Sequence, residues 1–125
     1  MRLKQAFLLL QALALLGFGL AYLIMPLEMA KLSGMGLLTT AALTDVRAYY
    51  GGLEIGLALY LLLSLKTEAD RFNALRLLGI LYFALFGARL AGVLIDGGDQ
   101  QFNYIALGLE GVSLVLAVFL MGRRG

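Results

Sequence analysis

Four long apolar stretches constrain the fold of this chain more than any other feature. They lie at about residues 5–25, 45–65, 74–95 and 103–121 of the 125-residue sequence. An α-helix rises about 1.5 Å per residue, so about twenty residues cross the ~30 Å hydrocarbon core of a bilayer. Hydrophobic residues make up 62% of the chain and charged residues only 14%. The sequence therefore predicts an all-α integral membrane protein, a four-helix bundle that forms a single domain over residues 1–125.

The distribution of basic residues predicts the orientation of these spans. Basic side chains gather at the N-terminus, in the turn after the second span and at the C-terminus, whereas the other two connections hold only Lys31 and Arg47. Because Lys and Arg are enriched in cytoplasmic loops, we expect both termini to lie in the cytoplasm. The residues that carry this prediction are Arg2, Lys4, Lys66, Arg71, Arg76, Arg123 and Arg124.

The first connection, residues 26–44, is long and is not plainly hydrophilic. Pro26 ends the first span, because proline has no backbone N–H to continue a helix. The following Ser-Gly-Met-Gly stretch is typical of a break in regular structure. Thr40 or Thr44 is expected to cap the second span. The connection is either an ordinary loop at the membrane interface or a lid over the outer end of the bundle.

Composition excludes much of the usual enzyme chemistry. The chain has no cysteine and no histidine, which excludes disulfides, thiol chemistry and imidazole ligands or bases. We therefore expect no cofactor and no metal site. The net charge of +2 is too small to indicate nucleic-acid binding. The expected partners are the lipid bilayer, a small-molecule or lipid ligand, and a second copy of the chain or a larger membrane complex.

Three charged residues interrupt the predicted spans, namely Glu54, Arg89 and Glu110. A charge near the bilayer centre costs roughly 2.5–3.5 kcal/mol on insertion scales, so such residues normally face the bundle interior and are paired or functional. In a four-span topology all three lie about seven residues, or ~10 Å, from the outer ends of their helices. We therefore expect them to share one layer of the bundle.

A second set of polar residues lies seven residues nearer the outer surface on the same three helices. A seven-residue step along an α-helix drifts by only ~20° around its axis. We therefore expect each outer residue to stand above an inner one. The expected pairs are Arg47 over Glu54, Asp96 over Arg89, and Asn103 over Glu110.

This coincidence of depth and spacing favours a polar pocket that binds a small polar or amphipathic, lipid-like ligand. Arginine suits phosphate or carboxylate groups, and the acids suit amine or hydroxyl groups. One alternative is a structural or accessory subunit whose charges only lock the helices. Others are a proton-linked carrier and a membrane enzyme that uses a glutamate as acid or base, although no nucleophile–base pair or metal set favours catalysis. The candidate ligand-binding residues are Arg47, Tyr50, Glu54, Arg89, Asp96, Asn103 and Glu110.

Small residues spaced four apart predict where helices pack closely. The pairs are Gly52 with Gly56, Ala88 with Gly92, and Gly17 with Ala21. The triplet Gly-Leu-Glu also occurs twice, at residues 52–54 and 108–110, on two helices expected to run in the same direction. This recurrence indicates a duplicated helical hairpin, the kind of parallel repeat found in some transporters.

The run LTDVRAYYGGLEIGLALYLLL, together with the later GARLAGVLIDG and Glu110, resembles the domain-of-unknown-function 4345 family of small bacterial inner-membrane proteins. That family is itself similar to the DoxX-like group of four-helix membrane proteins. The resemblance implies a multi-pass fold in the bacterial inner membrane and supplies no activity. Its signature R-A-x-Y-G-G-L-x-x-G is matched by Arg47, Ala48, Tyr50, Gly51, Gly52, Leu53 and Gly56, with further matches at Ala88, Arg89, Asp96 and Gly97.

Overall fold

The computed structural model of this protein describes residues 2–123, so Arg124, which contributes to the predicted orientation, lies outside the described residues. All regular secondary structure in the described part of the chain is helical. The chain divides into two compact units, a first unit of Met1–Thr67 and a second unit of Glu68–Gly125. Each unit contains two of the four predicted spans.

Four helices among residues 2–123 are long and apolar enough to cross a membrane. The all-helical, four-span prediction is confirmed, and it indicates a multi-pass membrane protein. Two boundaries differ from the predicted ones, because the second span begins at Thr40 and the third at Glu68. Charged residues at the end of a span are compatible with a continuous helix, because that end projects beyond the hydrocarbon core of the bilayer. The spans are Leu3–Ile24, Thr40–Leu63, Glu68–Asp96 and Gln101–Met121.

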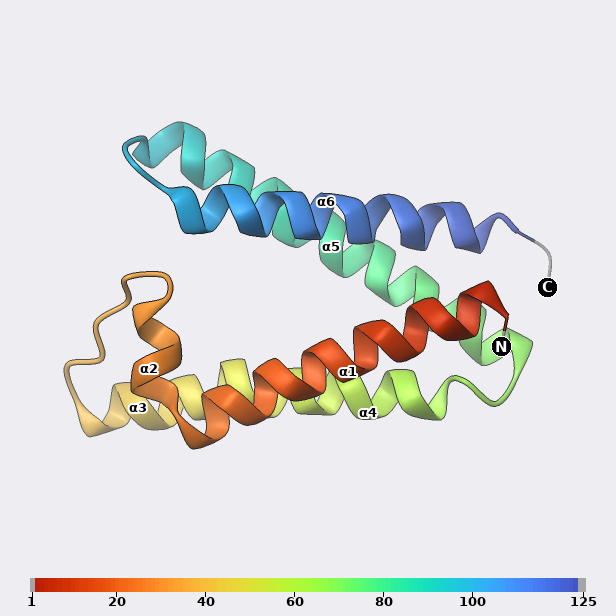
Figure 1. Cartoon of the computed structure of the whole chain (residues 1–125), viewed down its shortest axis with the longest axis horizontal. Helices are drawn as coiled ribbons and strands as arrows, with labels where there is room; N and C mark the ends of the chain where they lie inside the picture. Colours follow the sequence, from red (N-terminus) through yellow and green to blue (C-terminus); the bar gives the residue numbers. More distant parts are fainter. Residues whose placement is uncertain (1, 124–125) are drawn as a thin grey trace. The chain divides into compact units, whose positions relative to one another are not determined.

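The first unit pairs helix α1 (Leu3–Ile24) with a second, antiparallel span made of three consecutive helical segments (Figure 1). These segments are α3 (Thr40–Val46), the π-helix η1 (Arg47–Gly52) and α4 (Leu53–Leu63). A short helix, α2 (Pro26–Lys31), lies in the connection and packs against α1. The predicted loop over residues 26–44 therefore contains a helix and the first turn of the second span.

Local sequence explains where these helices begin and end. Met25 leaves the helical region with φ −128° and ψ 61°, because the residue before a proline is displaced from that conformation. Pro26 then starts α2, where its missing N–H costs nothing. The cap of α3 is Thr39, whose hydroxyl accepts a hydrogen bond from the Ala42 N–H at 3.1 Å. The prediction that Thr40 or Thr44 caps this span was wrong by one residue or more.

Glycines bring the two spans of the first unit into close backbone contact, but they are not the glycines expected. A Cβ on Gly19 would lie 2.9 Å from the Gly51 carbonyl oxygen, and one on Gly51 would lie 3.1 Å from the Leu23 nitrogen. By contrast, a Cβ on Gly17 or Gly56 would meet nothing within 4 Å. Within the first unit the expected close packing is therefore absent at these two positions, because the crossing of the helices places a different face in contact.

The second unit is an antiparallel pair of helices, α5 (Glu68–Asp96) and α6 (Gln101–Met121) (Figure 1). The turn between them contains Gly97 at φ 65° and Gly98 at φ 78°, a left-handed conformation that glycine adopts without a steric penalty. A Cβ on Gly111 of α6 would lie 3.2 Å from the Phe86 ring of α5. This turn and this close contact set the register that brings the polar residues of the two helices together.

Candidate functional site

The polar centre of the second unit is an ion pair between Arg89 on α5 and Glu110 on α6. The Arg89 Nε lies 2.5 Å from Glu110 Oε1, and Nη2 lies 3.4 Å from Oε2. The guanidinium therefore faces the carboxylate with two nitrogens, which is the strong, directional form of this interaction. The Glu110 side chain is only 10% exposed and the Arg89 side chain 28%. The pair joins the two helices inside their spans.

Asn103 extends this pair toward the turn between α5 and α6. Its Oδ1 accepts a hydrogen bond from Arg89 Nη1 at 2.7 Å, and its Nδ2 donates to Gln100 Oε1 at 2.8 Å. Gln100 in turn donates to the Gly97 carbonyl at 2.5 Å. Asn103 and Glu110 are seven residues apart on α6 and both contact Arg89, as their shared face predicts. A continuous hydrogen-bonded chain thus runs from Glu110 to the turn.

Asp96 does not belong to this chain of hydrogen bonds. It is the last residue of α5 and is exposed. Within the described second unit, no hydrogen bond or ion pair joins it to Arg89, although the seven-residue spacing placed it above that residue. The guanidinium of Arg89 points to α6, because Glu110 and Asn103 offer it oxygens there. The structure therefore brings together three of the four candidate residues on these helices.

In the first unit, Arg47 caps the C-terminal end of α1. Its Nη1 donates a hydrogen bond to the Leu23 carbonyl oxygen, in the last turn of that helix. The last carbonyls of a helix lack partners within the helix, and a cation there also complements the helix dipole. The neighbouring rings of Tyr22 and Tyr50 lie 5.0 Å apart at an angle of 33°. Arg47 and Tyr50 thus both hold the end of α1 against η1.

The π-helix η1 is a feature that the sequence analysis missed. The Leu53 N–H bonds to the Ala48 carbonyl, five residues back, so this turn is wider than an α-helical turn. The seven-residue step from Arg47 to Glu54 includes η1, so the angle between these two side chains around the helix axis differs from the ~20° expected in a regular α-helix. The side chains accordingly differ, since Arg47 is exposed and Glu54 is half-buried. The pair Gly51-Gly52 is the one local signal, because glycine tolerates altered helical geometry.

Glu54 differs from the other candidate residues in having a buried side-chain atom without a partner among the described residues. Its Oε2 atom is buried and has no hydrogen-bond partner within residues 2–123, the only such side-chain atom in that range. Glu54 lies in the first turn of α4, inside the second span. A buried polar group without a partner costs roughly 1–3 kcal/mol, so its retention calls for an explanation. The same Gly-Leu-Glu triplet therefore gives a paired acid in the second unit and an unpaired one in the first.

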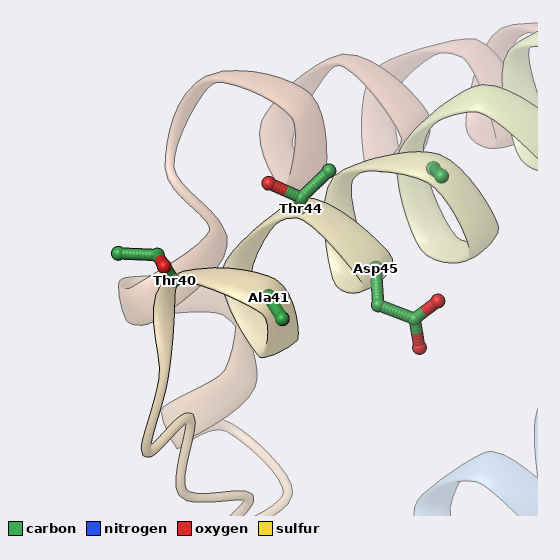
Figure 2. A pocket seen from close by; sticks show the side chains of 5 residues that line it. Thr40, Ala41, Thr44 and Asp45 are labelled. Atoms are coloured by element: carbon green, nitrogen blue, oxygen red, sulfur yellow. The ribbon is translucent and has the colours of Figure 1, made fainter.

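An open depression of about 430 Å³ lies against α3 and the start of η1 (Figure 2). The Thr44 hydroxyl and the Asp45 carboxylate point in different directions there, so they do not converge on one position (Figure 2). In the described range, no three Asp or Glu side chains form a group that could hold a metal ion. The lining residues of the depression are Thr40, Ala41, Thr44, Asp45 and Ala48.

Comparison with known proteins identifies the family of the chain. No curated protein and no solved structure matches it. The family model described as "Domain of unknown function (DUF4345)" matches residues 3–121, nearly the full length. The match covers both units and every residue of the candidate set. The chain thus belongs to the domain-of-unknown-function 4345 family, in which its four candidate spans make it a multi-pass membrane member.

Proposed function

We propose that this protein binds a small polar or amphipathic, lipid-like ligand within the membrane and that Glu54 contacts it. The observation that carries the proposal is the buried Oε2 atom of Glu54, which has no hydrogen-bond partner among the described residues. Buried polar atoms normally have partners, and acids inside membrane spans are usually functional. A ligand that donates a hydrogen bond to Oε2 would satisfy this atom.

The chemistry of Glu54 limits the class of ligand. A carboxyl group pairs with an amine, a hydroxyl or an amide N–H. The residues around it on α4 are apolar, and Leu53 beside it is exposed. A ligand that reaches this depth from the bilayer therefore needs an apolar body beside its polar group, as a lipid-like molecule has. Arg47, Tyr50, Arg89, Asp96, Asn103 and Glu110 stay predictions as further ligand contacts.

Native mass spectrometry of the protein, purified in a mild detergent, tests this proposal. We expect a defined small mass on the wild type that is missing from Glu54→Leu and present on the control variant Glu28→Gln, whose acid lies on α2 outside the spans. Glu54→Gln then separates two ligand classes. Its amide keeps an oxygen for a hydroxyl donor, but it removes the negative charge that an amine requires.

Two outcomes would contradict the proposal. The same bound mass on the wild type and on Glu54→Leu would place the ligand elsewhere. A wild-type protein that carries no ligand, both in detergent and in discs of the host membrane lipid, would favour the second candidate function. That function is a structural or accessory subunit, and the paired state of Arg89, Glu110 and Asn103 is the observation that favours it.

We also propose the bacterial inner membrane as the location, with both termini in the cytoplasm. The orientation is supported by the distribution of basic residues. The location is supported by the four candidate spans and by the resemblance of the sequence to small bacterial inner-membrane proteins. Because the chain has no cysteine, single cysteines at Ser33 and Thr67 report the two sides without background. A membrane-impermeant maleimide should label the variant at position 33 in whole spheroplasts and the variant at position 67 only after lysis. The reverse pattern would overturn the orientation.

A further inference from the structure

The segment between the two spans of the first unit, residues 25–39, exposes three leucines although it lies outside both spans. The charged side chains of Glu28 and Lys31 are exposed beside them. We call residues 25–39 the connecting segment. Leu27 is 45% exposed, Leu32 is 56% exposed and Leu38 is 93% exposed. Exposed side chains of this size on a water-facing loop would be unfavourable, because each leaves a large apolar area in water. The segment therefore needs an apolar or amphipathic partner.

The connecting segment has a defined shape, so these exposures are not those of a loose loop. Pro26 and Ala30 are buried and hold α2 against the end of α1. After α2, the Met35 N–H bonds to the Ala30 carbonyl and the Gly34 N–H to the Lys31 carbonyl, with Gly34 at φ 77°. This is a Schellman arrangement, which ends the helix and reverses the chain. The outward leucines are therefore presented by an ordered scaffold.

The position of the segment identifies the bilayer surface as its partner. It begins directly after α1 ends at Ile24 and finishes directly before the second span begins at Thr40. Tyr22, near the end of α1 where the segment begins, packs against the Tyr50 ring of the second span, and aromatic side chains are enriched at the membrane–water boundary. Ile24 and Met25, where α1 passes into α2, are also exposed.

We infer that the connecting segment binds the boundary between lipid headgroups and acyl chains, with Leu27, Leu32 and Leu38 inserted among the chains. It would then be an interfacial anchor of the first unit and not a water-exposed lid. The segment carries one acid and one base, Glu28 and Lys31, so its charges cancel. Binding therefore depends on apolar contact and needs no anionic lipid. This inference does not depend on the proposed ligand function.

Tryptophan fluorescence tests the inference, because the chain contains no tryptophan. Leu38→Trp is reconstituted as the full chain into phosphatidylcholine vesicles whose acyl chains are brominated either near the headgroup or near the bilayer centre. The matched control is Asp99→Trp, an exposed position in the α5–α6 turn, which four spans place on the same side of the membrane. Substitution at these exposed positions leaves the packed interior unchanged.

We expect shallow bromines to quench the tryptophan at position 38 at least twofold more than deep ones, and to quench position 38 more strongly than position 99. The quenching should be unchanged at high salt. A red-shifted, unquenched tryptophan at position 38 would show a water-exposed lid and overturn the inference. A blue-shifted but unquenched one would show that protein, such as a second copy of the chain, covers the segment, and it would overturn the inference as well.

Discussion

The two units differ in the main contact that holds their helices together. In the first unit the backbones of α1 and η1 approach closely at Gly19 and Gly51, and Arg47 caps the end of α1. In the second unit an ion pair inside the spans, between Arg89 and Glu110, joins α5 to α6. Small residues and polar side chains are the two recognised means of helix association in membranes. Each unit uses both, but the backbone contact is closest in the first unit and the ion pair inside the spans occurs in the second.

The comparison shows that an identical triplet acquires its role from the opposite helix. Gly-Leu-Glu occurs once in each unit, but only Glu110 has an arginine on the helix beside it. Helix α1, the partner of α4, contains no acid and has a single base, Lys4, in its first turn. It therefore offers no charge at the depth of Glu54. The unpaired acid, and the ligand proposed for it, follow from this asymmetry.

The largest expected effect comes from breaking the ion pair of the second unit. Arg89→Leu leaves the buried Glu110 carboxylate without its cation, which costs about 3–5 kcal/mol of unfolding free energy for buried pairs. Titration with a denaturing detergent, followed by circular dichroism, measures this. Arg76→Leu, an exposed arginine on the same helix, is the control and should change little. The double variant Arg89→Leu/Glu110→Leu should recover most of the loss; no recovery would show that the pair is not what joins the helices.

The next effect concerns the close backbone contact in the first unit. Gly19→Ala places a Cβ 2.9 Å from the Gly51 carbonyl oxygen, so the helices must separate. Overpacking of this kind costs typically about 1–3 kcal/mol. Gly17→Ala, two residues earlier on α1, adds the same methyl group to open space and is the matched control. Equal stability of the two variants in the same titration would contradict the contact.

Removing the Arg47 cap should have a smaller effect. Arg47→Gln loses a charge-assisted hydrogen bond to the Leu23 carbonyl and a cation at the end of α1, together about 1 kcal/mol. Amide hydrogen exchange should show faster exchange in the last turn of α1 and in α2, with α5 and α6 unchanged. Uniformly faster exchange in both units would indicate a role beyond capping.

The smallest change in unfolding free energy should come from Glu54→Gln. Comparing this variant with Glu110→Gln distinguishes the two Gly-Leu-Glu triplets most clearly. Glu54→Gln removes no protein partner, so we expect unfolding free energy to change by less than about 0.5 kcal/mol in ligand-free protein. Glu110→Gln leaves Arg89 without its carboxylate and should cost about 1–3 kcal/mol. Comparable losses in the two variants would show that Glu54 also has a structural partner.

Part of the candidate site was predictable because depth and helix face follow from residue spacing. Asn103 and Glu110 are seven residues apart on α6 and both reach Arg89. The same spacing did not make Asp96 a hydrogen-bond partner of Arg89, because spacing says nothing about which neighbour a side chain prefers. The rule does not apply in its regular form to Arg47 and Glu54, because the π-helix between them changes the angle per residue. Such a local departure depends on packing against α1, which spacing along one helix does not include.

The sequence by itself determined the class of fold and the number of spans, because apolar length and the cost of charge in lipid act on each segment separately. The tertiary structure alone decided the pairings. It placed Gly19 against Gly51 and Arg89 against Glu110, and it left Oε2 of Glu54 without a partner. Pairing depends on which faces of two helices meet and at what register. That information belongs to the contact between two segments and is absent from either one alone.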